Sequence, residues 1–482
     1  MEKQEINKFS KTPLIQALKE YEKKDSLRFH MPGHKGRCPR GVFCDIKENL
    51  FGWDVTEIPG LDDFAQPEGP IKEAQEKLSA LYGADTSYFL VNGATSGIIS
   101  MMAGALSEKD KILIPRTSHK SVLSGLILTG ASAAYIMPER CEELGVYAQV
   151  EPYAITNKLI ENPDIKAILV TNPVYQGFCP DIARIAEIAK ERGTTLLADE
   201  AQGPHFGFSK KVPQSAGKFA DAWVQSPHKM LTSLTQSAWL HIKGNRIDKE
   251  RLEDFLHIVT TSSPSYILMA SLDGTRELIE ENGNLYIEKA VELAQKARYE
   301  INNSTVFYAP GQEILGKYGI SSQDPLHLMV NVSCAGYTGY DIEKALREDF
   351  SIYAEYADLC NVYFLITFSN TLEDIKGLVA VLSHFKPLKN KVKPCVWIKD
   401  LPKVALEPKK AFKLPAKSVP LKDSAGSVSK RPLVPYPPGA PLVMPGEIIE
   451  KEHIEMINEI LNSGGYCQGV TSEKFIQVVT DF

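Results

Sequence analysis

Residues 92–97, Asn-Gly-Ala-Thr-Ser-Gly, form a small polar segment that follows an apolar run of strand length and precedes a run of helix length. At a strand-to-helix turn, free backbone N–H groups and the hydroxyls of Thr95 and Ser96 would meet an anion at the positive end of the helix dipole. Such a loop can bind a phosphate. Ordinary turns before helices have the same composition, so this segment alone leaves both interpretations open.

Two charged residues end apolar runs further along the chain. Asp199 follows the run 195–198, where a carboxylate is costly to bury without a cationic or hydrogen-bonding partner, for example a protonated pyridine nitrogen. Lys229 follows a mostly apolar run, and a partly desolvated lysine can have a lowered pKa and form an imine with an aldehyde. Taken singly, a capping Asp and a surface Lys with a buried stem are the better interpretations. A phosphate loop, an Asp and a later Lys in this order are together what pyridoxal 5'-phosphate (PLP) requires.

The elements that position these residues alternate between strand and helix over about residues 65 to 245, which predicts a parallel sheet covered on both faces. A helix is expected to begin at Pro70, to bury Ile71, Ala74, Leu78 and Leu81, and to end at Gly83. The other helix expected here is 181–192, and the expected strands are 88–91, 111–114, 167–171, 195–198, 222–225 and 238–242. Since ligands bind beyond the carboxyl ends of strands in such sheets, residues 92–96, Asp199 and residues 226–229 should lie close together.

From about residue 265 the pattern changes to a helix-rich connection at 279–304 and a smaller αβ unit, with strands at 326–332 and 362–368 and helices at 341–349 and 372–385. Residues 386–430 are rich in Lys and Pro, as in a loop-rich connection, and a short helix is expected near 450–461. We therefore predict an N-terminal arm and entry segment (1–64), a cofactor-binding large domain (65–265), a linker helix and small αβ domain (266–385) and a C-terminal domain (386–482).

Composition limits the class of protein. The chain has 482 residues, 43% hydrophobic and 24% charged, with a net charge of -6, so no overall basic field favours nucleic acid or an anionic membrane. Its eight cysteines are scattered, without a CxxC pair or the Cys/His spacing of a zinc site, so we expect reduced thiols and no metal. The N-terminus lacks the apolar core of a signal peptide, and no stretch approaches the ~20 apolar residues of a membrane span. These observations predict a cytoplasmic location.

Several longer segments, in this order, resemble one known family. They are Phe29 to Gly36 (FHMPGHKG), Leu61 to Phe64 (LDDF), Arg116 to Ser121 (RTSHKS), Thr171 to Gly177 (TNPVYQG), Asp199 to Ala201 (DEA), Ser226 to Lys229 (SPHK) and Pro435 to Gly439 (PYPPG). The chain resembles the short-form bacterial ornithine/lysine/arginine decarboxylases of PLP fold type I nearly end to end, and is closest in look to biosynthetic arginine decarboxylases. The resemblance implies a large domain with a mostly parallel seven-stranded sheet, a small α+β domain and a C-terminal domain.

Carried over residue by residue, the resemblance implies a Schiff base on Lys229 and pairing of Asp199 with the pyridine nitrogen. Ala201 would lie against one ring face and His119 would stack on the other, although without the family context His119 is an ordinary histidine at a helix start. The phosphate would be bound by Ala94, Thr95, Ser96, Ser226 and His228. Family members usually form dimers or larger assemblies with shared active sites, so Thr261, Ser262 and Ser263 would serve the cofactor of a neighbouring subunit.

The substrate is expected to be a basic L-amino acid, with arginine preferred and lysine or ornithine as alternatives. Candidates for its positive end are Glu355 and Asp358, with Asp62 and Asp63 near the entrance, and a solvated acidic surface is the competing interpretation. Two departures from the family pattern affect the pocket. Gln202 stands where His or Trp more often follows Asp-Glu-Ala, with Pro204 before His205, and 174–176 read Val-Tyr-Gln instead of Thr-Tyr-Tyr or Thr-Tyr-Phe.

Two further functions remain open. An aminotransferase or aldolase of the same fold would keep Lys229 and Asp199, but residues 30–36 and 436–439 argue against it. A catalytically silent regulatory homologue that binds other subunits is the alternative from another class. Such a copy is free to lose Lys229, Asp199 and His119, and all three are present.

Overall fold

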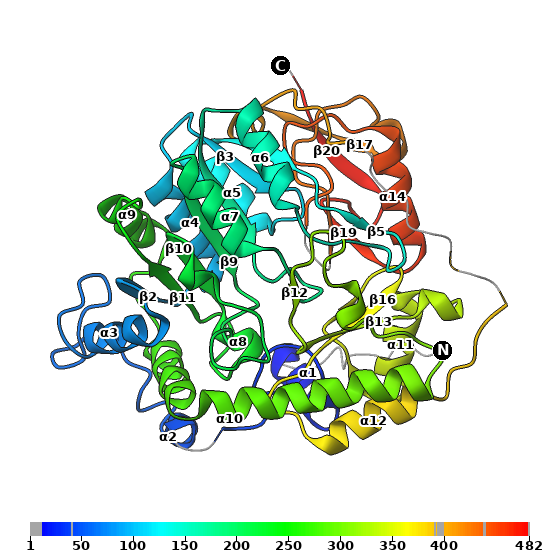
Figure 1. Ribbon diagram of the computed structural model, residues 1–482, viewed down its shortest axis with the longest axis horizontal. Coiled ribbons are helices and arrows are strands. Elements are labelled where there is room, and N and C mark those ends of the chain that lie inside the picture. Colours follow the sequence, from blue (N-terminus) through cyan, green and yellow to red (C-terminus); the bar gives the residue numbers. More distant parts are fainter. Residues whose placement is uncertain (1–11, 40–41, 390–391, 393–399, 437–439, 481–482) are drawn as a thin grey trace.

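A seven-stranded sheet forms the centre of the computed structural model, which describes residues 12–39, 42–389, 392, 400–436 and 440–480 (Figure 1). Its spatial order is β2 (Thr86–Leu90), β11 (Ala238–Ile242), β10 (Ala222–Gln225), β9 (Thr195–Glu200), β7 (Ile165–Thr171), β3 (Lys111–Pro115) and β4 (Ser132–Ile136). β11 is antiparallel to both of its neighbours, and the other adjacent pairs are parallel. The predicted α/β fold with a mostly parallel seven-stranded sheet is confirmed.

Helices cover both faces of this sheet. On one face lie α4 (Gly93–Ala105), α5 (Lys120–Thr129) and α9 (Lys249–Val259), and on the other lie α6 (Pro152–Glu161) and α7 (Ile182–Glu191). Along β9, Leu197 packs in the first of these cores while Leu196 and Ala198 pack in the second. Because alternate residues are buried on opposite faces, such strands read as continuous apolar runs, which is why the sequence predicted them.

The sequence missed the edge strand β4, whose residues are partly buried except for Ile136. Its small residues Ser132, Ala133 and Ala134 give little strand propensity. By contrast, α3 (Pro70–Tyr82) begins at the predicted Pro70 and ends before Gly83, which has a φ of 66° that glycine adopts without strain.

A long helix, α10 (Tyr266–Ser304), leads from the large domain to the small one (Figure 1). It begins 13 residues before the predicted 279, with Ser265 as its N-cap. The small domain contains an antiparallel sheet of β13 (His327–Asn331), β16 (Asn361–Leu365) and β15 (Tyr356–Ala357), with helices α11 (Gly339–Asp349) and α12 (Leu372–Leu382).

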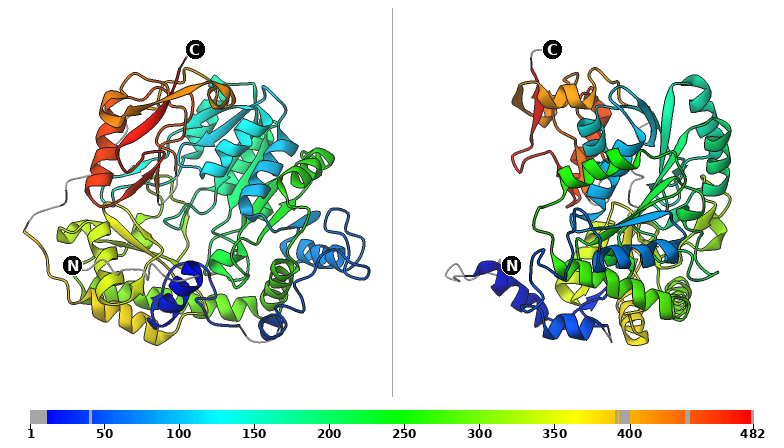
Figure 2. Two further views of the ribbon diagram at one scale, coloured as in Figure 1. Left: turned by 180° about the vertical axis from the view of Figure 1, so that it is seen from behind. Right: turned by 90° about the vertical axis from the view of Figure 1, so that its left-hand side faces the viewer.

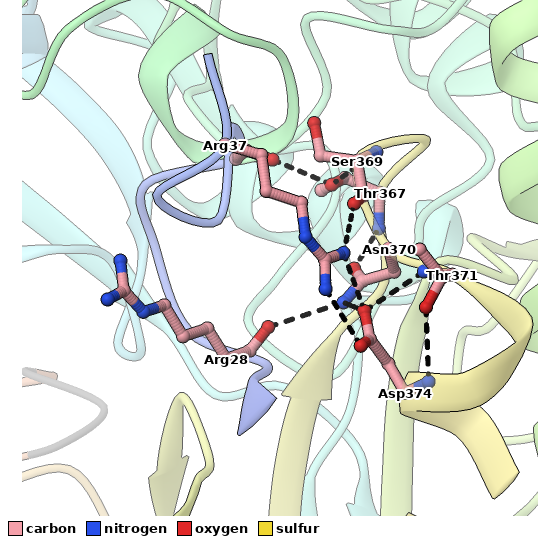
Figure 3. A network of polar contacts seen from close by, with 8 residues as sticks. Arg28, Arg37, Thr367, Ser369, Asn370, Thr371 and Asp374 are labelled. Atoms are coloured by element: carbon pink, nitrogen blue, oxygen red, sulfur yellow. Dashed lines mark hydrogen bonds and ion pairs between the residues drawn. The ribbon is translucent and has the colours of Figure 1, made fainter. Parts of the chain in front are cut away.

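The N-terminal segment has the helices α1 (Pro13–Glu22) and α2 (Val42–Glu48) and the strand β1 (Leu27–Arg28). β1 pairs in parallel with β14 (Ile352–Tyr353) of the small domain. Arg37 donates two hydrogen bonds to Asp374, at 2.7 and 2.8 Å, and the Asn370 amide donates to the Arg28 carbonyl oxygen (Figure 3). These contacts fix residues 28–37 on the small domain.

The C-terminal region contains the strand pairs β17 (Ala416–Pro420) with β20 (Phe475–Val479) and β18 (Val434–Tyr436) with β19 (Tyr466–Gln468). Its helices are α13 (Pro408–Lys413) and α14 (Lys451–Asn462), the second close to the predicted 450–461. Both views in Figure 2 show this region, coloured orange and red, beside the large domain. Residues 437–439 of the predicted Pro-Tyr-Pro-Pro-Gly segment lie outside the described residues, as do residues 1–11 of the predicted arm.

The division at residues 64, 265 and 385 stays a prediction. Seven cysteines in the described ranges are free thiols, while Cys395 lies outside these ranges. Within the described residues, no helix combines the length and apolar character needed to cross a membrane.

Candidate active site

A cavity of about 500 Å³ lies at the carboxyl ends of the central strands. The carboxyl ends of β2, β3, β7, β9 and β10 and the segments that follow them supply its polar residues, including Thr95, His119, Asp199, Ser226 and Lys229. The C-terminal region supplies an apolar wall, which we call the roof: Pro402, Pro435, Ala440, Pro441, Leu442, Met456 and Ile460. Residues from distant parts of the chain therefore enclose one space.

Asp199 and Lys229 face this cavity from neighbouring parallel strands. Asp199 lies in β9 opposite Val224 of β10, and Lys229 lies in the short helix α8 (Pro227–Met230) that follows β10. Burial raises the pKa of Asp199, against the opposing effect of the Lys229 charge. Burial lowers the pKa of Lys229, while Asp199 and Glu355 oppose this shift. A lysine with a lowered pKa is more often present as the neutral amine, which is the form that attacks a carbonyl.

Polar groups suited to an anion lie nearby. Helix α4 begins at Gly93, and Ala94 and Thr95 of its first turn line the cavity. Ser226 also lines it, and its buried hydroxyl has no hydrogen-bond partner among the described residues. Because burying an unpaired hydroxyl is costly, this group fits a bound acceptor. The residues present therefore fit the phosphate of PLP.

Two of the predicted phosphate ligands are already engaged within the protein. The Ser96 hydroxyl donates to the Gly93 carbonyl oxygen at 2.8 Å, and Ser96 does not line the cavity. With its hydroxyl engaged in this way, the backbone N–H of Ser96 at the helix start is the group that stays proposed for the phosphate. His228 lines the cavity, and its Nδ1 lies 2.7 Å from the Ser237 carbonyl oxygen, so Nδ1 carries the hydrogen and Nε2 remains for other contacts.

His119 lies on the cavity wall as the N-cap of α5. Its Nδ1 accepts a hydrogen bond from the Ser121 backbone N–H at 3.2 Å, so the hydrogen of the neutral ring is on Nε2. Burial, together with the charges of Lys229 and Lys120, lowers the pKa of His119 to about 3. His119 is therefore a flat, neutral ring, and with Ala201 it lines the same cavity.

The two carboxylates proposed for the substrate differ in placement. Asp358 lines the cavity, and its carboxylate accepts hydrogen bonds from the Tyr363 hydroxyl at 2.6 Å and the Cys360 and Asn361 backbone N–H groups at 2.8 Å. Burial raises its pKa to about 6. Glu355 does not line the cavity but accepts a hydrogen bond from the Met31 backbone N–H at 2.7 Å. Burial raises the pKa of Glu355, against the charges of Lys35, Lys229 and His327.

Asp62, which was predicted near the entrance, is not among the residues that line the cavity. Its carboxylate accepts hydrogen bonds from the backbone N–H groups of Asp63, Glu68, Gly69 and Ile71, at 2.8 to 3.1 Å, and so organises the loop before α3. Asp63 serves the same loop by accepting from the Ala65 N–H at 2.7 Å. The exposed residues 261–263 also lie outside the cavity lining.

Several residues of the site were not identified from the sequence. Arg116 lines the cavity and forms a buried ion pair with Glu447, with N–O distances of 2.6 and 2.8 Å. Glu200 is fully buried beside Asp199 and accepts four hydrogen bonds, from Asn172, Ser215, Ala216 and Gln225. Burial raises its pKa to about 7. The roof was also missed, although the Pro435 to Gly439 motif adjoins part of it.

The departures from the expected pattern lie at the cavity. Val174, Tyr175, Gln176 and Gln202 all line it, and the Lys229 Nζ lies 5.7 Å from the centre of the Tyr175 ring. An aromatic ring at this distance attracts a cation. These differences from the family pattern therefore change the part of the cavity wall that faces the ligand.

Solved structures share this fold. Lysine decarboxylase A from Pseudomonas aeruginosa superposes with a TM-score of 0.78 at 20% identity, covering 96% of this chain and 80% of that one. YbdL from Escherichia coli, whose structure is described as identifying a methionine aminotransferase function, gives 0.56 at 12% identity, covering 80% and 100%. The fold is that of PLP fold type I proteins, a class that includes decarboxylases and aminotransferases.

Sequence comparisons narrow this class. The family described as "Orn/Lys/Arg decarboxylase, major domain" matches residues 12–374, and "Orn/Lys/Arg decarboxylase, C-terminal domain" matches residues 394–463. An arginine decarboxylase of Bacillus anthracis is 36% identical over 95% of this chain and 94% of its own length. An arginine decarboxylase of Bacillus subtilis (strain 168) is 35% identical over 95% of each chain. The chain belongs to the Orn/Lys/Arg decarboxylase family, as the sequence predicted.

Proposed function

We propose that this protein is a PLP-dependent decarboxylase that converts arginine to agmatine and carbon dioxide. The observation that carries the proposal is the pairing of a buried carboxylate, Asp199, with a desolvated amine, Lys229, in one cavity beside the unpartnered Ser226 hydroxyl. The relatives named arginine decarboxylase support arginine over lysine and ornithine.

When bound, PLP supplies an electron sink for the bond that breaks at the substrate Cα. Lys229 Nζ would be the amine that holds it, and Asp199 would hold a proton on its ring nitrogen. The first turn of α4 and Ser226 would bind its phosphate. The neutral imidazole of His119 and the methyl group of Ala201 would contact its ring.

The roof contributes through its apolar character. Proline, leucine, methionine and isoleucine side chains offer no hydrogen bonds to a carboxylate or to water. A dry environment disfavours the charged carboxylate relative to neutral carbon dioxide, so it favours loss of the carboxyl group. We assign the roof the role of excluding water from the breaking bond.

Asp358 is the proposed partner for the positive end of the substrate. Apart from Asp199, it is the acidic side chain that lines the cavity within the described residues. Its raised pKa, about 6, reflects a carboxylate that burial has desolvated and that gains from a cationic neighbour. Glu355 is proposed as a second negative charge behind Met31.

The functional form is proposed to be a homo-oligomer with shared active sites. The N-terminal segment exposes large apolar side chains, including Leu14, Leu18 and Phe51, of which Phe51 is 92% exposed. Exposed apolar groups of this kind mark protein contact surfaces, and a second copy is the proposed partner. Thr261, Ser262 and Ser263 are exposed and are proposed to reach the cofactor of that copy.

The test is a carbon dioxide release assay with arginine, lysine and ornithine in parallel, with identification of the amine product and of PLP by its visible absorbance and borohydride trapping. Agmatine as the main product is expected. Faster carbon dioxide release from lysine or ornithine would show that arginine is not the preferred substrate. A keto acid product would indicate an aminotransferase. Absence of a trapped PLP band would favour the silent regulatory homologue.

A further inference from the structure

A buried chain of polar side chains stands behind the cavity wall. Asp324 Oδ2 lies 2.9 Å from His205 Nε2 and 2.7 Å from His327 Nδ1. None of the three side chains is more than 2% exposed. His205 comes from the turn after β9, and His327 begins β13 of the small domain. These three side chains therefore connect the large domain to the small domain directly behind the site.

The Asp324 carboxylate is the hydrogen-bond acceptor between the two histidines. Burial alone would raise its pKa, but the charges and hydrogen bonds of His205 and His327 hold it well below its usual range. An ionised carboxylate only accepts hydrogen bonds, so His327 Nδ1 must donate to it. The other charged or titratable groups facing this chain are the Arg298 guanidinium, which lies 3.4 Å from the His327 carbonyl oxygen, and the Glu355 and Cys179 side chains.

The other nitrogen of His327 faces Gln202. His327 Nε2 lies 3.5 Å from Gln202 Oε1, at the outer limit of a hydrogen bond. Gln202 is only 4% exposed and lines the cavity, and its amide nitrogen has no partner among the described residues. The Gln202 amide oxygen is therefore the end of the side chain that faces His327, which leaves the Gln202 N–H groups for other acceptors.

We propose that Gln202 donates its amide N–H to an anionic oxygen bound in the cavity, and that His327, Asp324 and His205 are positioning residues that hold the amide in this orientation. The proposal rests on the proposed function for its ligand. Two oxygens share the required chemistry: the ring hydroxyl oxygen of PLP, when ionised, and the substrate α-carboxylate. In either case the chain of histidines fixes which end of the amide faces the ligand.

The experiment uses the full-length protein and the variants Gln202→Leu, which removes the donor, and Gln202→His, which can supply an N–H. Gln75→Leu is the matched control, because Gln75 is a buried glutamine that accepts from the Phe89 N–H and does not line the cavity. Apo-protein is titrated with PLP, and the pH midpoint of the visible band is measured without substrate. The KM for arginine and the inhibition constant of agmatine, which lacks the carboxylate, are then compared.

If the donor contacts the ring oxygen, Gln202→Leu will shift the pH midpoint of the band and weaken PLP binding roughly 10-fold or more, since hydrogen bonds to charged groups are the stronger ones. If it contacts the α-carboxylate, PLP binding will be unchanged, and KM for arginine will rise by a similar factor while agmatine binds as before. Gln202→His should restore part of the loss. Wild-type values in Gln202→Leu for PLP binding, the pH midpoint of the band, the KM for arginine and the inhibition constant of agmatine would overturn the proposal.

The positioning chain is tested by His327→Asn, which keeps a donor for Asp324 but is too short to reach Gln202, and by the double variant with Gln202→Leu. The single change should reproduce part of the Gln202→Leu effect, and the double variant should add nothing further. Fully additive effects would overturn the role of His327. If His327→Asn does not fold, Gln202→Leu alone decides the donor role. Failure of the wild-type protein to bind PLP would refute the proposed function instead.

Discussion

The buried ion pair between Arg116 and Glu447 offers the sharpest prediction about stability. Their side chains are 6% and 2% exposed, and they connect the large domain to the C-terminal segment that provides the roof. Glu447 also accepts from the Met444 N–H at 2.7 Å, and Arg116 donates to the Leu442 carbonyl oxygen at 2.9 Å. Leu442 is itself part of the roof, so the pair positions the cavity wall.

Replacing Glu447 by Leu will leave the Arg116 guanidinium buried without its partner. Removing one partner of a buried pair costs about 3–5 kcal/mol, so the free energy of unfolding should fall by this amount. Replacing both residues, as in Arg116→Met with Glu447→Leu, should recover most of the loss because no buried charge remains. Urea unfolding followed by fluorescence measures the free energy of unfolding of the wild-type protein and of both variants, and the KM for arginine should rise in the single variant.

The pair between Glu108 and Lys409 is a matched control, because it connects the same two regions but is exposed to solvent. Glu108→Ala should leave the urea midpoint unchanged within error. The reasoning is refuted if Glu447→Leu loses no more stability than Glu108→Ala, or if the double variant is less stable than the single one.

Three further predictions concern the cofactor, acid stability and assembly. Lys229→Ala should abolish turnover and borohydride trapping with an unchanged circular dichroism spectrum, and retained steady-state activity would refute its role. Burial lowers the pKa of His241 to about 3, so the folded chain does not take up the proton that the unfolded chain binds below about pH 6.5. Stability is therefore lost as the pH falls through this range, by up to ~1.4 kcal/mol per pH unit, and His241→Gln should reduce this slope in urea unfolding at pH 7 and 5.5. An equal slope in both proteins would contradict the assignment. Phe51→Asp should lower the mass measured by light scattering, and an unchanged mass would count against this surface as the contact between copies.

The sheet could be predicted because each central strand contains a run of buried apolar residues. The prediction failed at β4, which lies at the edge of the sheet and has a strand neighbour on one side only. Its small residues give little strand propensity. The prediction also failed over the first turns of α10, where Gly274 interrupts the expected pattern but is buried in the structure. Both failures have the same origin, since tertiary packing overrides weak local preferences.

The candidate site was predictable where a residue type is unusual for its position. Asp199 lies near the end of one buried strand and Lys229 follows the next, and these neighbouring parallel strands bring their ends together. Contacts between distant residues gave no such signal: Arg116 meets Glu447 across 331 positions, and Gln202 meets His327 across 125. Nor could a charge pattern reveal that the Asp62 carboxylate accepts hydrogen bonds from its own loop.

The roof has a consequence for the order in which the protein is made. The roof residues Pro435, Leu442 and Ile460 help to complete a cavity whose reactive groups lie at 199 and 229, so about 200 further residues must be synthesised after Lys229 before the cavity can close. Until those residues are in place, Asp199 and Lys229 lack one apolar wall of the cavity that surrounds them in the folded protein.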